Sequence, residues 1–154
     1  MKRLKEILGY YATIDEFLER ERLVSVKDGD WLKKIEDRQR INDHAYFILG
    51  WGQLEATLDA ECRNAIRKRR DNPDWSKRRG WDLYQPDAKK LSGLTFEDRV
   101  TLLLDRKSKS GEWQKVMRWY NLRNLIAHGG SHEDRIDLNA VVRDFYLIQT
   151  AIAP

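Results

Sequence analysis

The chain has little of what disulfide-bonded, metal-binding and membrane proteins need. Its 154 residues contain a single cysteine, Cys62, so no internal disulfide can form and a cysteine-based zinc site is not expected. The three histidines do not lie at metal-ligand spacing, and we expect neither a metal nor another cofactor. No apolar run approaches the length of a membrane span, and the first residues lack the apolar core of a signal peptide. We therefore expect a cytoplasmic protein that does not enter a membrane.

Proline is also scarce, which leaves long stretches of the chain free to be helical. The three prolines are Pro73, Pro86 and Pro154. Apolar side chains recur between them at helical spacing, and Asp28-Gly29-Asp30 is typical of a turn. The pattern predicts helices over residues 1–23, 35–69, 94–104, 111–128 and from Asp137 to near the C-terminus.

These elements predict one all-α domain over residues 1–154. The expected architecture is a helical bundle of about five helices with a long central helix. Residues 1–30 would form its N-terminal helix and turn. Residues 67–93, which contain two of the prolines and many cations, would form a basic loop or irregular insertion.

Three polar residues lie near the end of the helix predicted over residues 111–128. Arg123 is followed directly by Asn124, and His128 comes four positions after Asn124. Gly129 can take the left-handed conformation that ends helices, which would place His128 in the last turn. Apolar residues lie on two opposite sides of this helix, so one side can meet the protein's own core and the other a second subunit. We therefore expect the three polar residues to lie near an interface.

The run Arg123-Asn124, with His128 after it, resembles the Arg-x4-6-His motif of the HEPN superfamily. The aromatic-rich run over residues 45–55, which leads into Glu55, is similar to the long helix of bacterial HEPN proteins. The resemblance implies a HEPN-like bundle and a metal-independent endoribonuclease that leaves a 2′,3′-cyclic phosphate at a composite site of a homodimer. It further implies RNA as substrate, a toxin or defence role, and an antitoxin or neighbouring-gene partner. In some HEPN proteins an antitoxin modifies a tyrosine just after the histidine. Here Gly129 follows His128, so this tyrosine is missing, which argues against that arrangement but not against the ribonuclease.

The residue types suit this chemistry. RNA carries its own nucleophile, the 2′-hydroxyl, so cleavage needs a proton-transfer group, which His128 supplies, and a cation on the phosphate, which Arg123 supplies. Asn124 would support them with a further hydrogen bond. On an ideal helix Arg123 and His128 point about 140° apart. They converge only if the helix unwinds at Gly129, if the long arginine reaches across, or if two subunits contribute.

Glu55 lies among the apolar residues of the predicted long helix. A carboxylate there must be paired, hydrogen-bonded or protonated, because an isolated buried charge is costly. Arg123 is the obvious partner. Glu55 would then either orient two helices as a buried ion pair or hold the guanidinium in the site. In the purely structural alternative, His128 only caps its helix.

The segment over residues 67–79 is strongly basic and contains tryptophan. Cations there can bind RNA phosphates while exposed rings stack on unpaired bases. The alternative is a solvated charged loop, and the net charge of +4 allows acidic partners without requiring them. The candidates for RNA binding are Arg69, Arg70, Lys77, Arg78 and Arg79.

A second class of function stays open beside the ribonuclease. The chain would then be a non-catalytic HEPN-like module that binds nucleotides or RNA, or that dimerises, and acts with a partner protein. If Arg123, Asn124 and His128 lie open in a dimer cleft, the enzyme is favoured. If they are sealed in the core, the module is favoured.

Overall fold

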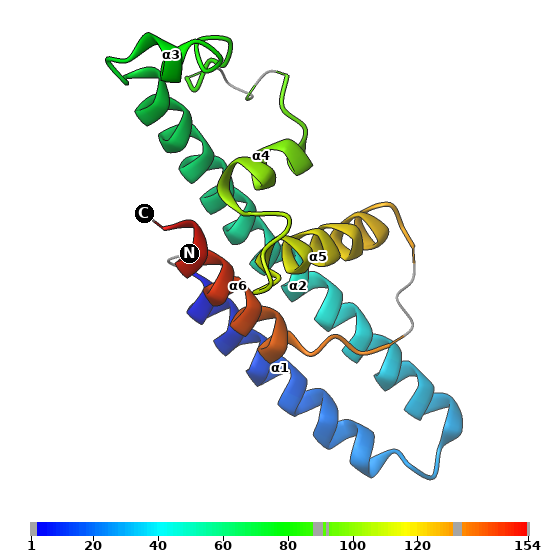
Figure 1. Ribbon diagram of the computed structural model, residues 1–154. Helices are drawn as coiled ribbons and strands as arrows, with labels where there is room; N and C mark the ends of the chain where they lie inside the picture. Colours follow the sequence, from blue (N-terminus) through cyan, green and yellow to red (C-terminus); the bar gives the residue numbers. More distant parts are fainter. Residues whose placement is uncertain (1–2, 88–90, 92, 131–133, 154) are drawn as a thin grey trace. The chain divides into compact units, whose positions relative to one another are not determined.

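The computed structural model describes residues 3–87, 91, 93–130 and 134–153, and these residues contain six α-helices and no strand (Figure 1). The predicted all-α class with a long central helix is therefore confirmed. Over this part of the chain, no helix is both long enough and apolar enough to cross a membrane. The helices are α1 (Leu4–Val24), α2 (Gly29–Arg70), α3 (Trp75–Arg78), α4 (Phe96–Leu103), α5 (Glu112–Ala127) and α6 (Leu138–Ile152).

Short polar side chains begin two helices where the sequence predicts them. Thr95 accepts a hydrogen bond from the Asp98 amide at 3.1 Å, and the Asp98 carboxylate accepts one from the Thr95 amide at 2.9 Å. This reciprocal pair is a capping box, and it satisfies amides that a helix start leaves without partners. Asp137 likewise accepts a hydrogen bond from the Ala140 amide at 3.0 Å at the start of α6. The two helices therefore begin within two residues of the predicted positions, residue 94 and Asp137.

The start predicted for α2 was wrong by about one and a half turns. The helix begins at Gly29, not near residue 35. The Asp28 carboxylate accepts a hydrogen bond from the Trp31 amide at 3.1 Å, as a helix cap does. Aspartate and glycine favour turns and helix starts alike, so Asp28-Gly29-Asp30 ends the turn and also begins the helix. The region predicted to be irregular also contains one helical turn, α3, which Asp74 caps.

The chain divides into two compact units. Unit 1 comprises Met1–Leu54 and Trp119–Phe145, and unit 2 comprises Glu55–Arg118 and Tyr146–Pro154. Three helices, α2, α5 and α6, contribute residues to both units. The single domain expected from the sequence stays a prediction.

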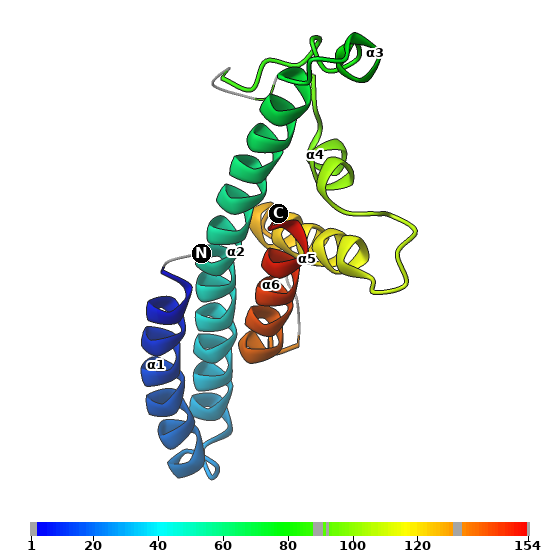
Figure 2. The same ribbon diagram turned by 60° about the vertical axis from the view of Figure 1, so that its left-hand side comes forward.

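In unit 1, α1 and the first part of α2 form an antiparallel helical hairpin (Figure 2). Aromatic rings pack within this unit: the Trp51 ring centroid lies 6.1 Å from that of Tyr120 and 6.2 Å from that of Phe145. Burial of such a side chain contributes roughly 1.5–3 kcal/mol. The apolar side predicted on α2 is buried here at Phe47, Trp51 and Leu54. Three further residues of unit 1 are almost completely buried beside them: Leu4, Ile35 and Phe145.

In unit 2, the second part of α2 packs against α4 and the segment that precedes it. Cys62 is completely buried in this cluster, and burial raises the pKa of its thiol to about 11. The thiol therefore stays protonated and behaves as a small apolar side chain. An ion pair between Asp59 and Arg99 also joins α2 to α4. The apolar cluster comprises Cys62, Ile66, Leu91, Trp81, Tyr84, Leu94, Leu102 and Leu103.

Candidate functional site

The end of α5 has the geometry that the glycines predict. Gly129 has φ of +76°, its amide donates to the Ile126 carbonyl at 3.1 Å, and the Gly130 amide donates to the Leu125 carbonyl at 2.9 Å. These two bonds form a Schellman ending, which satisfies carbonyls that the helix leaves without partners. His128 follows the last helical residue with its side chain exposed. The helix end therefore presents an imidazole to solvent.

The structure brings Arg123 and Asn124 together. Both side chains are half-buried near the end of α5, and the Arg123 guanidinium donates to Asn124 Oδ1 at 2.9 Å. That bond uses the carboxamide oxygen and leaves the Asn124 NH2 group as a donor. Asn124 can thus orient the guanidinium and offer a hydrogen bond of its own.

The structure does not join Arg123 to His128. Within the residues described, no hydrogen bond links the two side chains, and Arg123 is half-buried while His128 is exposed. Since α5 stays helical through Ala127, the helix does not unwind before His128. Of the three routes to a shared site, arginine reach and a second subunit are left.

One of the two apolar sides of α5 meets the protein's own core. The Trp119 ring lies 5.9 Å from that of Phe47, and its Nε1 donates to Asp144 at 3.1 Å. Trp119 lies on the same side of α5 as Leu125 and Ile126, so the protein's own core covers that side at Trp119. Toward the helix end, on the same side, Leu125 is 44% exposed and Ile126 is only half-buried. The expected burial of both sides is not reached in one chain, and cover by a second subunit stays a prediction.

Glu55 is half-buried in α2, and its pairing with Arg123 stays a prediction. The completely buried carboxylate of α2 is instead Asp43, which the sequence reasoning missed. It accepts hydrogen bonds from Tyr11 Oη at 3.0 Å and from Arg135 Nε at 2.5 Å. Arg135 also donates to Asp15 at 2.5 Å. A signal for Asp43 was available, because it precedes buried residues of α2 at helical spacing.

The network raises the pKa of two of its members, Tyr11 and Arg135. Burial, and after it the negative charge of Asp43, raises the pKa of Tyr11 above its usual value. The hydrogen bond to Asp43 raises the pKa of Arg135 as well. Tyr11 therefore stays neutral and Arg135 stays charged near neutral pH, so the network serves to hold α1, α2 and the segment before α6 together.

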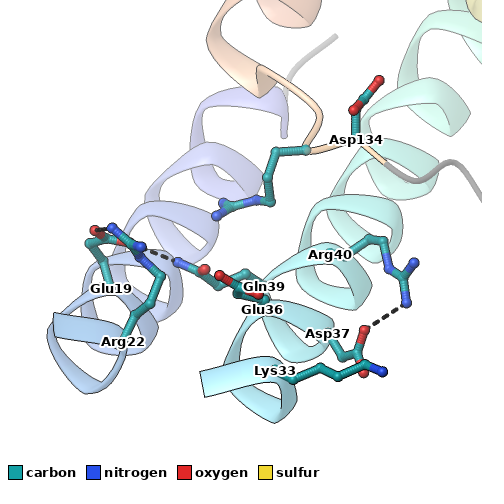
Figure 3. A pocket seen from close by; sticks show the side chains of 9 residues that line it. Glu19, Arg22, Lys33, Glu36, Asp37, Gln39, Arg40 and Asp134 are labelled. Carbon is teal, nitrogen blue, oxygen red and sulfur yellow. Dashed lines mark hydrogen bonds and ion pairs between the residues drawn. The ribbon is translucent and has the colours of Figure 1, made fainter. Parts of the chain in front are cut away.

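A pocket of about 600 Å³ opens beside the network in unit 1 (Figure 3). Glu19 accepts two hydrogen bonds from Arg22, each at 2.8 Å, and one from Gln39 at 3.1 Å. These bonds, those of Arg22 foremost, lower the pKa of Glu19 to about 2. Arg40 and Asp37 pair at 2.8 Å on the opposite wall. Cations and acids line the pocket in equal numbers, so it has no excess charge with which to attract an ionic ligand.

Three of the five basic residues proposed to bind RNA are paired with acids nearby. Arg70 and Arg78 lie 3.8 and 3.7 Å from the carboxylate of Asp82, and Lys77 lies 3.7 Å from that of Asp74. These exposed pairs are weak, and a phosphate could replace the acids. They nevertheless favour, for these three residues, the interpretation as a solvated charged loop.

The other two basic residues lie over tryptophan rings. Arg69 is 4.4 Å from the centroid of Trp81, and Arg79 is 5.8 Å from that of Trp75. Trp75 is 61% exposed. Such stacks hold a guanidinium in place while its edge stays free to bind an anion.

Comparison with known proteins gave no match of this chain to a family model, a curated protein or a solved structure. Across the part of the chain that the structure describes, no three His, Cys, Asp or Glu side chains group as metal ligands do. The end of α5 carries an oriented guanidinium, an amide donor and an exposed imidazole.

Proposed function

We propose that this protein is a metal-independent endoribonuclease of the HEPN type that acts as a homodimer. The observation that supports the proposal best is the end of α5. There the guanidinium of Arg123 is oriented by Asn124, and the exposed His128 lies on the ordered helix ending. These are the groups that phosphodiester cleavage by the RNA's own 2′-hydroxyl requires.

In the proposed reaction, the 2′-oxygen attacks the adjacent phosphorus and the bond from phosphorus to the 5′-oxygen breaks. His128 of one subunit accepts the 2′-proton, and the same residue of the other subunit protonates the departing 5′-oxygen. Arg123 and Asn124 stabilise the negative charge that develops on the phosphate oxygens. The products are a 2′,3′-cyclic phosphate and a 5′-hydroxyl.

The first test is cleavage of mixed cellular RNA in the presence of EDTA. We expect the wild-type protein to cleave and His128→Ala to lose about 100-fold or more in rate, because the proton-transfer group is gone. Arg123→Lys should also lose activity, because lysine keeps the charge but not the two-pronged contact with phosphate.

A matched control is Arg38→Ala, which removes an exposed arginine of α2 that lies over Trp31. It should cleave like the wild type, and folding of each variant is checked by circular dichroism. Equal cleavage by wild type and His128→Ala would contradict the proposal.

The bond between Arg123 and Asn124 also favours a second candidate, because a guanidinium engaged by its own neighbour serves a structural role. The protein would then be a non-catalytic module that binds RNA or nucleotides, or that dimerises, together with a partner such as an antitoxin. A folded dimer that binds RNA without cleaving it would support this candidate over the endoribonuclease.

A further inference from the structure

A second pocket, of about 530 Å³, lies in unit 2 beside the C-terminal end of α2. Its size falls in the range of roughly 300–1,000 Å³ that is usual for small-molecule sites. Leu103 at the end of α4 and Ile152 at the end of α6 give it apolar walls. Such walls can cover the faces of a planar ring.

Two amides on the polar side of this pocket are both arranged as donors. Asn72 Oδ1 accepts a hydrogen bond from the Asp74 amide at 3.0 Å, and Asn64 Oδ1 accepts one from Arg67 at 3.5 Å. Because both oxygens are engaged within the protein, the NH2 groups are left to donate. A ligand that meets them must carry hydrogen-bond acceptors.

Two cations complete the polar side. Arg69 is held over the Trp81 ring, so its guanidinium plane is already oriented, and Lys68 is exposed beside it. One acid, Glu61, also lines the pocket. Donors therefore outnumber acceptors, and the pocket suits a ligand that is anionic at one end and rich in acceptors along a flat ring.

We propose that this pocket binds one nucleotide unit. The base lies between the apolar walls with its acceptors on Asn64 and Asn72, and the phosphate lies on Lys68 and Arg69. Two sources share this chemistry: a single-stranded segment of RNA and a free nucleotide. The RNA source rests on the proposed function, since the pocket would then hold one nucleotide of the substrate.

The test measures fluorescence anisotropy of a labelled single-stranded RNA octamer with the His128→Ala chain, so that cleavage does not consume the probe. Unlabelled AMP and inorganic phosphate serve as competitors. Asn64→Asp keeps the shape of the side chain but replaces a donor with a negative acceptor, and Lys68→Ala removes one cation. Each should weaken binding about tenfold, the usual effect of losing a charge-assisted hydrogen bond.

Lys107→Ala removes the same charge from an exposed loop of unit 2 outside the pocket. It should bind RNA like the parent chain. Lys68→Ala should also lower the dependence of log Kd on log salt by about one, which a purely structural effect would not do.

Each result assigns the site or overturns it. If AMP displaces RNA, and if Asn64→Asp and Lys68→Ala both bind RNA more weakly than the parent chain, the site is supported with RNA as the source. AMP binding by calorimetry that is lost in both variants, without RNA binding, supports it with a free nucleotide as the source. The proposal is overturned if phosphate competes as well as AMP, if both variants bind like the parent, or if neither ligand binds.

The same protein separates this proposal from the endoribonuclease. If wild type cleaves RNA and Lys68→Ala cleaves with unchanged KM, the pocket does not hold the RNA substrate and the enzyme stands. If the pocket binds RNA and wild type does not cleave, only the enzyme proposal fails.

Discussion

Asp43 joins three parts of unit 1 through one carboxylate. It accepts a hydrogen bond from Tyr11, two from Arg135 and one from the backbone amide of Ile136. Its side chain is completely buried, whereas that of Arg135 is 42% exposed. The negative charge is therefore the more costly member of the pair to leave without its partner.

Asp43→Asn should lower the free energy of unfolding by about 2–3 kcal/mol, somewhat less than for a fully buried ion pair because Arg135 is partly in water. Urea denaturation followed by circular dichroism measures this. The matched control is Asp37→Asn, which removes a half-exposed partner of Arg40 and should cost less than about 1 kcal/mol. Equal losses in the two variants would show that burial of Asp43 is unimportant.

The different burial of Asp43 and Glu55 shows what the sequence does not predict about single residues of α2. Helical spacing places Glu55 among the apolar residues of α2, where it is half-buried, but it does not single out Asp43, which is completely buried. The partner of Asp43, Arg135, is 92 residues away along the chain. No spacing rule connects such a pair, because only the tertiary packing brings the two residues together.

At the scale of elements, the helix ends are the most predictable features. The capping box of α4, the Asp137 cap and the left-handed Gly129 are each encoded within a few residues. The start of α2 was missed because the same residue types serve turns and caps. The partial exposure of α5 could not be predicted, since a helical wheel does not say which side the remainder of the chain covers.

Gly129→Ala should destabilise the protein by about 1–2 kcal/mol, because an L-residue is strained at the φ of +76° found there. Gly130→Ala should also destabilise it, because an added Cβ would lie 2.9 Å from the Leu125 carbonyl oxygen. The control is Gly9→Ala in α1, where an added Cβ meets no atom within 4 Å and where alanine should stabilise the helix by about 0.5–1 kcal/mol. Thermal unfolding ranks the three, and a stabilising Gly129→Ala would contradict the helix ending described.

The hairpin of α1 and α2 has its own pH dependence through Glu19. Its pKa is lowered to about 2 from a usual value of 4.5, so the stability that it adds is fully present above about pH 4.5 and is lost as the pH falls toward 2. Urea denaturation between about pH 6 and pH 2 measures this. Wild type should have a higher free energy of unfolding than Glu19→Gln at pH 6, and the difference should disappear as the pH falls from about 4.5 toward 2. Glu16→Gln, at an exposed pair of the same helix, is the control. A constant difference between wild type and Glu19→Gln would rule out the effect.

At the scale of the whole molecule, uncovered apolar side chains bear on assembly. On α5, Leu125 is partly exposed and Ile126 is half-buried, which gives only a small apolar area. A stable interface typically buries about 800 Å² on each partner. Unit 1 exposes further large side chains that could add to it, including Tyr10 and Phe17 on α1 and Ile41 and Leu49 on α2. A homodimer that uses α5 would therefore need contact area from other exposed residues as well.

We expect the wild-type protein to sediment as a dimer at roughly 10 μM, a concentration at which standard-sized interfaces form. Leu125→Glu should shift it to monomer, because it places a charge in the proposed contact. Leu147→Glu, at a similarly exposed position of α6, should not. Dissociation by Phe17→Glu but not by Leu125→Glu would move the interface to α1, and a wild-type monomer would remove the composite site altogether.

The burial of Cys62 has a practical consequence for spectroscopy. A completely buried thiol with a pKa of about 11 does not react with maleimide or methanethiosulfonate reagents while the protein is folded. A cysteine introduced at an exposed position, such as Val26 on the turn of the hairpin, would then be labelled alone. The native chain thus accepts a spin label or fluorophore at a chosen position without removal of its own cysteine.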